Sequence, residues 1–148
     1  MRAVVTRVSS ASVTIDGAVV GEIGKGYLVL LGVAPEDTEE TAVKLADKIC
    51  NLRVFKDENE KMNLNLETVG GSFLVVSQFT LFADTSSRRP GFTGAAKPDI
   101  AIPLYEKFMA HCRSRGFTVA HGEFGADMKV ASVNDGPVTI LFDTAEKN

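Results

Sequence analysis

The residue types best suited to chemistry gather in the stretch Ser77–Leu81, with the sequence SQFTL. It follows Phe73-Leu74-Val75-Val76, an apolar run typical of a buried strand. Polar side chains at the end of such a strand cost free energy unless they find hydrogen-bonding partners. Two interpretations stay open: residues bonded to neighbouring backbone, or a site in which a rigid strand holds the Ser, Gln and Thr towards a polar ligand.

Elsewhere in the chain, the sequence patterns that usually mark catalytic nucleophiles, acid–base pairs or metal sites are missing. The nucleophile elbow G-x-S-x-G is absent, and His111 and His121 lack metal-ligand spacing to any partner, so we expect no metal and no cofactor. Cys50 and Cys112 fall in helical patterns without a CxxC motif. Thr80 is left as a candidate nucleophile without an evident activator. The alternative is that the substrate supplies a catalytic group and the protein supplies positioning and hydrogen-bond donors.

Length and composition favour one globular domain spanning residues 1–148, because 148 residues suffice to bury a real core. The N-terminus does not have the pattern of a signal peptide, since Arg7 interrupts a short apolar stretch, and no run reaches transmembrane length. The two cysteines are predicted to be buried free thiols in a reducing compartment. We therefore expect a cytoplasmic protein without membrane contact.

The net charge of −3 and the pI near 5.4 argue against a non-specific nucleic-acid binder, which would normally be basic. Local contacts to a structured RNA stay open, because Arg88 and Arg89 form a small basic cluster with Lys97. These residues belong to a long irregular segment, Thr85 to Lys97, and a loop of that length in a compact domain is more often functional than not.

The elements that must position these residues follow from hydrophobic periodicity. Helices are predicted after Asp37-Thr38 and from Pro98-Asp99 to Gly116, and Asp16-Gly17 signals a hairpin. Strands are predicted over 3–8, 12–15, 19–23, 27–33, 53–55, 73–76, 117–120, 128–133 and 138–142. The pattern indicates an α+β fold: a twisted, mostly antiparallel or mixed sheet that curls towards a barrel, with two main helices packed on it.

A second unusual stretch, NDGPVT, occupies residues 134–139. A simple turn between two strands is the ordinary interpretation. Glycine before proline is also a place where a cis peptide bond or a rigid exposed carbonyl can be built, and the sequence does not reveal the isomer.

Together, SQFTL and NDGPVT closely resemble the D-aminoacyl-tRNA deacylase family. The resemblance covers essentially the whole chain, including residues 3–21, 62–64 and the loop 89–98, with no departure at the motif positions. It implies a homodimer, with its active site at the subunit interface, that acts on the aminoacyl-tRNA 3′ end. The implied reaction is hydrolysis of the ester that links a D-amino acid to the terminal adenosine. Glycine, mischarged on tRNA-Ala, is implied as a further substrate of this chiral proofreading.

The resemblance also implies residue roles. Ser77, Gln78, Phe79 and Thr80 would bind the aminoacyl-adenosine end and hold its carbonyl. Whether Thr80 is the nucleophile or the 2′-OH of the tRNA does the chemistry stays open.

The resemblance assigns Gly136 and Pro137 to a chirality gate. Their cis peptide would reach from one subunit into the active site of the other and reject L-amino acids with backbone carbonyls. Phe92, Ala95 and Ala96 are candidates for the pocket mouth, and simple loop packing is the equal alternative.

Three hypotheses follow. The first is the editing hydrolase, and the second is an esterase that uses Thr80 as its nucleophile. The third is a non-catalytic module on the same fold that binds RNA or a protein partner.

Overall fold

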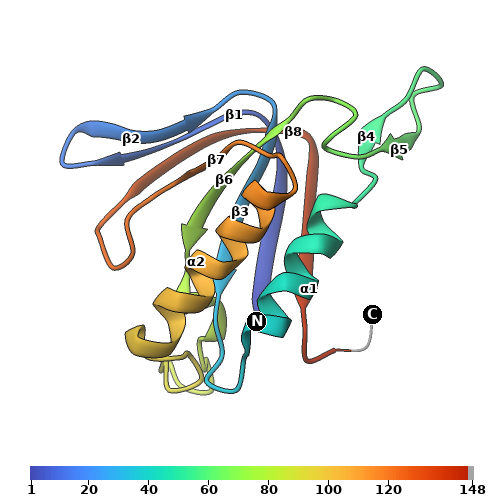
Figure 1. Ribbon diagram of the computed structural model, residues 1–148. Coiled ribbons are helices and arrows are strands. Elements are labelled where there is room, and N and C mark those ends of the chain that lie inside the picture. Colours follow the sequence, from blue (N-terminus) through green and yellow to red (C-terminus); the bar gives the residue numbers. More distant parts are fainter. Residues whose placement is uncertain (147–148) are drawn as a thin grey trace.

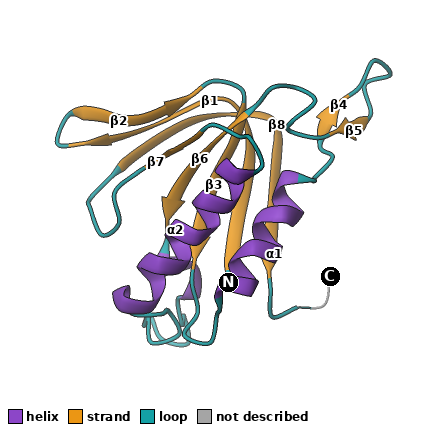
Figure 2. Cartoon of the chain, in the orientation of Figure 1, coloured by secondary structure: helices purple, strands orange, loops and turns teal. Residues whose placement is uncertain are grey.

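The computed structural model describes residues 1–146, and in it a curled mixed sheet carries two helices on one face (Figures 1 and 2). The elements in chain order are β1 Arg2–Ile15, β2 Ala18–Ile23, β3 Gly26–Gly32, α1 Glu39–Cys50, β4 Phe55–Lys56, β5 Met62–Leu64, β6 Ser72–Ser77, the 3-10 helix η1 Phe79–Phe82, α2 Pro98–Ser114, β7 Val119–His121 and β8 Lys129–Asp143. The main sheet has the order β2-β1-β3-β6-β7, with β8 also paired to β1, and β4 and β5 form a separate two-stranded sheet.

Strand β1 organises the sheet, because it pairs with three other strands. Its first half runs antiparallel to β3, its second half antiparallel to β2, and β8 follows its other edge. The hairpin predicted at Asp16-Gly17 is confirmed. Both residues have positive φ, 49° and 80°, as a tight two-residue turn requires.

The sheet curls until β2 lies against β7. Gly21 of β2 permits this approach, because a Cβ atom there would lie 2.7 Å from the carbonyl oxygen of His121. The parallel pairs β3–β6 and β6–β7 complete a mixed sheet that nearly closes into a barrel. The predicted fold class is confirmed.

Alternating side chains of the central strands fill two separate cores. Tyr27 and Val29 of β3, with Phe73 of β6, face the helices. Leu28 and Leu74 point the other way, into the curled sheet. Burial on both faces explains why these strands are continuous apolar runs rather than alternating ones.

The two helices begin as the sequence indicates. Thr38 caps α1, accepting a hydrogen bond from the N–H of Thr41, while the Thr41 hydroxyl accepts one from the N–H of Thr38. Pro98 occupies the first turn of α2, where its missing N–H costs nothing. Among residues 1–146, neither helix has the length and apolar character needed to cross a bilayer.

Cys50 of α1 and Cys112 of α2 are buried free thiols, as predicted, with their sulfur atoms 4.0 Å apart. The hydrogen bond to Cys50, together with burial, raises the pKa of the Cys112 thiol. A thiol held neutral in a core is a poor nucleophile, so this pair belongs to the helix packing.

The predicted strands 128–133 and 138–142 form one element, β8, instead of two strands joined by a turn. Asn134 pairs with Val8 and Thr139 with Thr6, so the chain keeps its direction and the residues between them bulge out of the ladder. Similarly, the predicted strands 3–8 and 12–15 are continuous in β1.

Candidate active site

Ser77 and Gln78 lie where two parallel strands end. Ser77 is the last residue of β6 and pairs with Leu31 of β3. The N–H of Gln78 donates to the carbonyl of Leu31 over 2.8 Å. The backbone at this point is therefore fixed by the sheet, which presents the side chains from a rigid support.

The chain then turns into η1, which carries Phe79 and Thr80. The side-chain amide of Gln78 donates to the Thr80 hydroxyl. Gly32 lets η1 pack closely against the end of β3. A Cβ atom at Gly32 would lie 2.9 Å from the carbonyl oxygen of Gln78 and 3.1 Å from the Phe82 ring.

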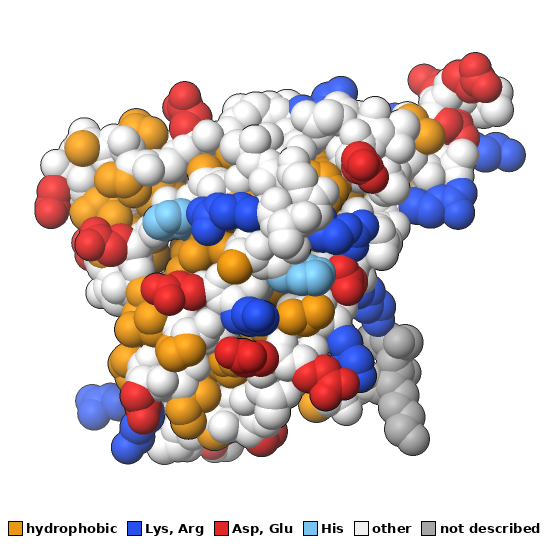
Figure 3. Space-filling model, in the orientation of Figure 1, with side chains coloured by type: hydrophobic (Ala, Val, Ile, Leu, Met, Phe, Trp, Pro, Cys, Tyr) orange, Lys and Arg blue, Asp and Glu red, His pale blue; other side chains and the backbone are white. Residues whose placement is uncertain are grey.

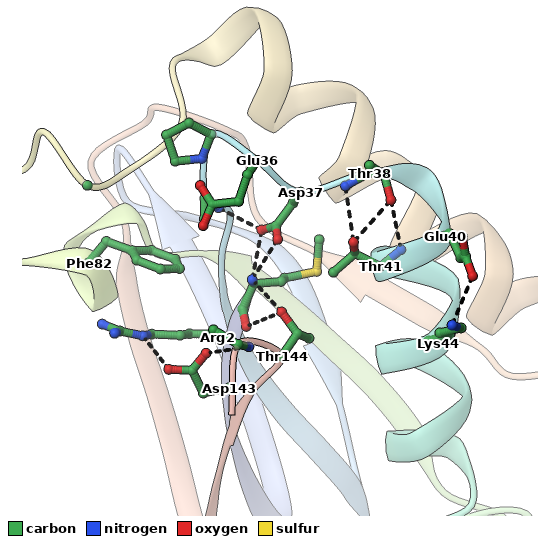
Figure 4. A pocket seen from close by; sticks show the side chains of 15 residues that line it. Arg2, Glu36, Asp37, Thr38, Glu40, Thr41, Lys44, Phe82, Asp143 and Thr144 are labelled. Carbon is green, nitrogen blue, oxygen red and sulfur yellow. Dashed lines mark hydrogen bonds and ion pairs between the residues drawn. The ribbon is translucent and has the colours of Figure 1, made fainter. Parts of the chain in front are cut away.

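Arg2 of β1 also holds η1 in place, through contacts with Leu81 and Phe82 (Figure 4). Its Nη1 donates to the carbonyl of Leu81 over 2.8 Å, and its guanidinium lies 4.6 Å from the centre of the Phe82 ring. Its Nε pairs with Asp143 at 3.0 Å. Burial opposes ionisation of Asp143, but hydrogen bonds from the Ala145 N–H and from Arg2 leave its pKa below the ordinary value.

A hollow of about 760 Å³ surrounds this Arg2 contact, at the ends of β1 and β8 (Figure 4). None of the site residues predicted from the sequence lines it. Its Asp143 and Arg2 are already paired with each other. We interpret the region as the support of η1 rather than as the site itself.

A smaller cavity of about 290 Å³ opens at the end of β6. Ser77, Gln78 and Phe79 form one wall, and Ala101 and Tyr105 of α2 form another. The segment 124–128 contributes the remaining side. A concave site of this size with a few polar groups on a rigid frame suits a small substrate group.

The other loop residues predicted for this region divide into two groups. Ala96 lines the cavity, and its N–H is tied to the carbonyl of Val33 over 2.8 Å. Thr80, Phe92 and Ala95 are not among the lining residues. Phe92 instead packs edge-on against Phe79, with ring centres 5.1 Å apart, and the Phe79 side chain remains 55% exposed.

Two lining residues were not predicted as part of the site. The Tyr105 hydroxyl donates to the carbonyl of Val75 over 3.0 Å, and burial raises its pKa to about 12, so it stays neutral. Asp127 is the only carboxylate among the cavity residues of the described chain, and its side chain is open to solvent.

The histidines lie outside the cavity. His111 is hydrogen-bonded to Asp47 at 2.7 Å, and His121 contacts the carbonyl of Gly122. Within residues 1–146, no three His, Cys, Asp or Glu side chains converge as a metal site would require. The cavity therefore offers hydrogen-bond donors and acceptors rather than a histidine acid–base pair.

The second motif lies on β8, where the Gly136-Pro137 peptide bond is cis. Arg7 holds this bulge from beneath. Its Nε donates to the carbonyl of Asp135 over 2.9 Å and its Nη1 to the carbonyl of Val54. Arg7 is only 4% exposed and is the one buried charged residue in the described part of the chain. Gly136 has φ of 140°, a conformation that an L side chain rarely adopts.

The two motifs do not meet within one chain. The bulge lies beside Arg7, which pairs with Tyr27, whereas Ser77 pairs with Leu31 at the other end of β3. Four residues along a strand span about 13 Å, and three strand spacings from β8 to β6 add about 14 Å across the sheet. Figure 1 agrees, with β8 bending at one end of the sheet and the segment after β6 at the other.

The side-chain types on the face drawn in Figure 3 are mixed, with basic and acidic groups scattered over the two helices. Asp47, His111 and Arg115 illustrate this mixture, since the carboxylate lies 2.7 Å from a nitrogen of each of the other two side chains. Such a surface shows no concentration of one charge that would mark it as a site. The candidate site is the cavity at the end of β6, because Ser77, Gln78 and Phe79 line it.

Comparison with known proteins identifies the family. The family model described as D-Tyr-tRNA(Tyr) deacylase matches residues 4–143. A D-aminoacyl-tRNA deacylase of Shewanella baltica (strain OS195) is 61% identical over 140 residues, covering 94% of this chain and 97% of the relative. One of Herpetosiphon aurantiacus is 54% identical over 147 residues, covering 99% and 96%.

A solved structure agrees with the fold. The protein named c-Myc DNA Unwinding Element Binding Protein superposes with a TM-score of 0.91 at 39% identity, covering 97% of this chain and 99% of that chain. The chain therefore belongs to the D-Tyr-tRNA(Tyr) deacylase family, and its enzymatic activity is that of a D-aminoacyl-tRNA deacylase, a hydrolase.

Proposed function

We propose that the chain hydrolyses the ester between a D-amino acid and the 3′-terminal adenosine of tRNA, releasing the free amino acid and tRNA. The observation that carries this assignment is the wall of Ser77, Gln78 and Phe79 at the end of a buried strand, facing a cavity of about 290 Å³. Sequence identity of 54–61% to D-aminoacyl-tRNA deacylases, over nearly the whole chain, supports it.

In this reaction water adds to the ester carbonyl, and the 3′ oxygen of the ribose leaves. The residues of η1 are suited to hold the carbonyl, because the first N–H groups of a helix have no partner within it. Ser77 and Gln78 add side-chain hydrogen bonds. Since no histidine lines the cavity, we favour a role for the 2′-OH of the tRNA in the proton transfers.

Thr80 as nucleophile is the competing mechanism. Its hydroxyl accepts a hydrogen bond from Gln78, an arrangement that does not remove its proton. If Thr80→Ala keeps near-normal turnover, the nucleophile role is eliminated. If turnover disappears while substrate still binds, the 2′-OH mechanism loses its support.

We further propose that two copies assemble so that the Gly136-Pro137 bulge of one faces the cavity of the other. The separation of the two motifs within one chain supports this arrangement, as does the exposed surface of β8. Leu141 is 74% and Val133 57% exposed on this strand, and among residues 1–146 only β1 pairs with it. An open apolar edge is a ready surface for a second copy.

In such a dimer the backbone carbonyls of the bulge would occupy the position that an L side chain needs. A clash with backbone rejects every L-amino acid whatever its side chain, without requiring recognition of the D side chain. Acceptance of varied D-amino acids follows, and so does acceptance of glycine, including glycine mischarged on tRNA-Ala.

The decisive experiment compares D- and L-aminoacyl-tRNA that carry the same amino acid on the same tRNA. Cleavage of the D form alone supports both the hydrolase and the gate. Cleavage of both forms keeps the esterase and removes the gate. Binding of tRNA with cleavage of neither form points to the non-catalytic module.

A further inference from the structure

We propose that Arg88, Arg89 and Lys97 form a docking surface, here called the basic rim, for the phosphates of the tRNA acceptor end. This inference rests on the function proposed above and adds the path of the polynucleotide outside the cavity. The basic rim lies on the irregular segment between η1 and α2.

Charge is unevenly distributed along the chain, and the segment that carries the site is locally positive. Residues 68–97 contain three basic residues and one acidic residue, a formal charge of +2, whereas the rest of the chain carries −5. An acidic protein repels a polyanion on average, so the attraction for tRNA must be local. Among the locally positive stretches of the chain, this one carries Ser77, Gln78 and Phe79.

The loop that carries the two arginines is internally ordered. Asp84 and Gly91 exchange two backbone hydrogen bonds, of 2.7 and 2.9 Å, which close the loop. The Asp84 carboxylate accepts from the N–H of Ser86, a contact that lowers its pKa. The only acidic group of the loop is therefore occupied by the loop backbone.

The three cations of the basic rim remain available. All three side chains are exposed, and within residues 1–146 no carboxylate pairs with any of them. An unpaired exposed guanidinium loses little when it moves from water to a phosphate, and its planar fork matches phosphate oxygens.

Two links tie the basic rim to the cavity, one through the Phe92 ring and one through the neighbour of Lys97 in sequence. Arg89 precedes Phe92 by three residues, which limits their separation to about 11 Å. Phe92 packs on Phe79, a cavity residue, and Lys97 directly follows the cavity residue Ala96. The exposed Phe79 adds an aromatic surface at the cavity wall. Cationic side chains with interposed aromatic rings are the usual means of binding an unpaired polynucleotide end.

The test compares the double charge reversal R88E/R89E with the matched control K44E/K107E, which changes the net charge equally on the two main helices. Three quantities are measured for each protein: hydrolysis of D-aminoacyl-tRNA, hydrolysis of D-aminoacyl-adenosine, and binding of uncharged tRNA over a range of KCl concentrations. D-aminoacyl-adenosine carries the same ester but has no polynucleotide.

For R88E/R89E we expect tRNA binding and kcat/KM on D-aminoacyl-tRNA to fall about tenfold or more at low salt. The slope of log affinity against log salt should decrease in magnitude by about 1.4, since each of the two lost single-strand phosphate contacts removes about 0.7. Hydrolysis of D-aminoacyl-adenosine should stay within about twofold of the wild type, which also shows that the variant is folded. The control should lose far less affinity.

Two results would overturn the basic rim. Equal losses on both substrates would mean that the arginines shape the cavity. Equal losses of tRNA affinity in both variants, or in neither, would mean that no local docking surface exists there. If the wild type cleaves neither substrate, the proposed hydrolase fails, while the tRNA-binding comparison still decides the docking surface.

Discussion

The SQFTL and NDGPVT motifs lie in opposite surroundings. Ser77 is the last residue of a strand that is buried on both faces, and Gln78 follows it directly. Close packing at Gly32 and a hydrogen bond from Arg2 hold η1 against the sheet. Gly136 and Pro137 lie on an exposed edge strand, where Arg7 provides the buried support. The first region depends on many packing contacts and the second on a few polar ones. Single substitutions should therefore separate turnover from selectivity.

The largest effect is expected for Arg7→Ala. It leaves the buried carbonyl of Val54 and the partly buried carbonyl of Asp135 without their charged donor, and a hydrogen bond to a charged group contributes about 1.5–3 kcal/mol. We expect a loss of about 3 kcal/mol in the free energy of unfolding and a decrease of more than tenfold in D-over-L selectivity. Urea denaturation and paired deacylation assays measure the two effects.

Arg113→Ala is the control for this change, because Arg113 is an exposed arginine bonded to a single carbonyl, that of Val119. Wild-type selectivity in Arg7→Ala, in a protein shown to be folded, would contradict the support role of Arg7.

Gly136→Ala should relax chirality by about tenfold with smaller loss of D activity. The φ of 140° is strained for alanine by about 1–3 kcal/mol, and the new Cβ would lie 2.8 Å from Val138 Cγ2 and 3.0 Å from Arg7 Nη2. A shift of the Gly136-Pro137 peptide would relieve the backbone strain and the close contacts, and it would move the carbonyls proposed to reject L-amino acids. A change of about 1.4 kcal/mol corresponds to a tenfold change in selectivity.

Gly70→Ala is the control for Gly136→Ala. Gly70 also has positive φ, but no atom lies within 4 Å of the position that a Cβ would take, so this variant introduces backbone strain without new close contacts. Unchanged D-over-L preference in Gly136→Ala would remove the gate assignment.

Gly32→Ala should act in the opposite way, lowering turnover without changing selectivity. The added Cβ forces η1 away from β3, because the oxygen of Gln78 at 2.9 Å is backbone and cannot rotate aside. A displacement approaching about 1 Å near the reacting group can reduce kcat/KM by up to about a hundredfold. Steady-state kinetics on D-aminoacyl-tRNA measure this loss.

Gly24→Ala is the matched control, as nothing lies within 4 Å of its Cβ position. A fall in D-over-L selectivity for Gly32→Ala would show that the two regions are not separable.

The smallest effect is expected for Asp47→Asn, on the helix surface away from both motifs. Hydrogen bonds from His111 and Arg115 lower the pKa of Asp47. A carboxylate with a depressed pKa stabilises the fold above its ordinary value of 3.8, and this contribution disappears as the pH falls through the folded-state pKa. Since the side chain is partly exposed, we expect less than about 1 kcal/mol.

Urea denaturation between about pH 7 and about pH 3 should show the difference between wild type and Asp47→Asn shrinking in acid. Deacylation at neutral pH should be unchanged. A stability difference that grows in acid would mean that folding raises the pKa of Asp47, contrary to the direction given above.

Local chemistry was sufficient to predict much of the fold. The Asp16-Gly17 turn, the Thr38 cap and the start of α2 at Pro98 each depend on residues close in sequence. The continuity of β8 does not. Asn134 to Pro137 has the composition of a chain reversal, and only its pairing with β1, a strand from the other end of the sequence, makes it a bulge.

The residues of the candidate site also divide into those that local sequence predicts and those that depend on contacts between distant segments. Ser77, Gln78 and Thr80 were found because polar residues at the end of an apolar run are conspicuous, and the first two line the cavity. Phe79, which the family resemblance indicated, lines it as well. Arg7 was not singled out, although alternation offered a signal: Ala3 and Val5 are buried, and Arg7 occupies the next inward position. The segment 124–128 has no such signal, since it lines the cavity through tertiary packing and follows Gly122, whose N–H donates to the distant carbonyl of Val75.

The three-way pairing of β1 has a consequence for synthesis and folding. Its first residues can align with β3 early, but one of its edges stays open until β8 has left the ribosome. Arg7 likewise meets its acceptor at Asp135 only at that stage. Pairing between segments so distant in sequence is slow to form and exposes strand edges meanwhile. A truncated or stalled nascent chain would thus leave this edge of β1 unpaired and open to chaperones, and the bulge to which we assign selectivity would be among the last parts of the fold to form.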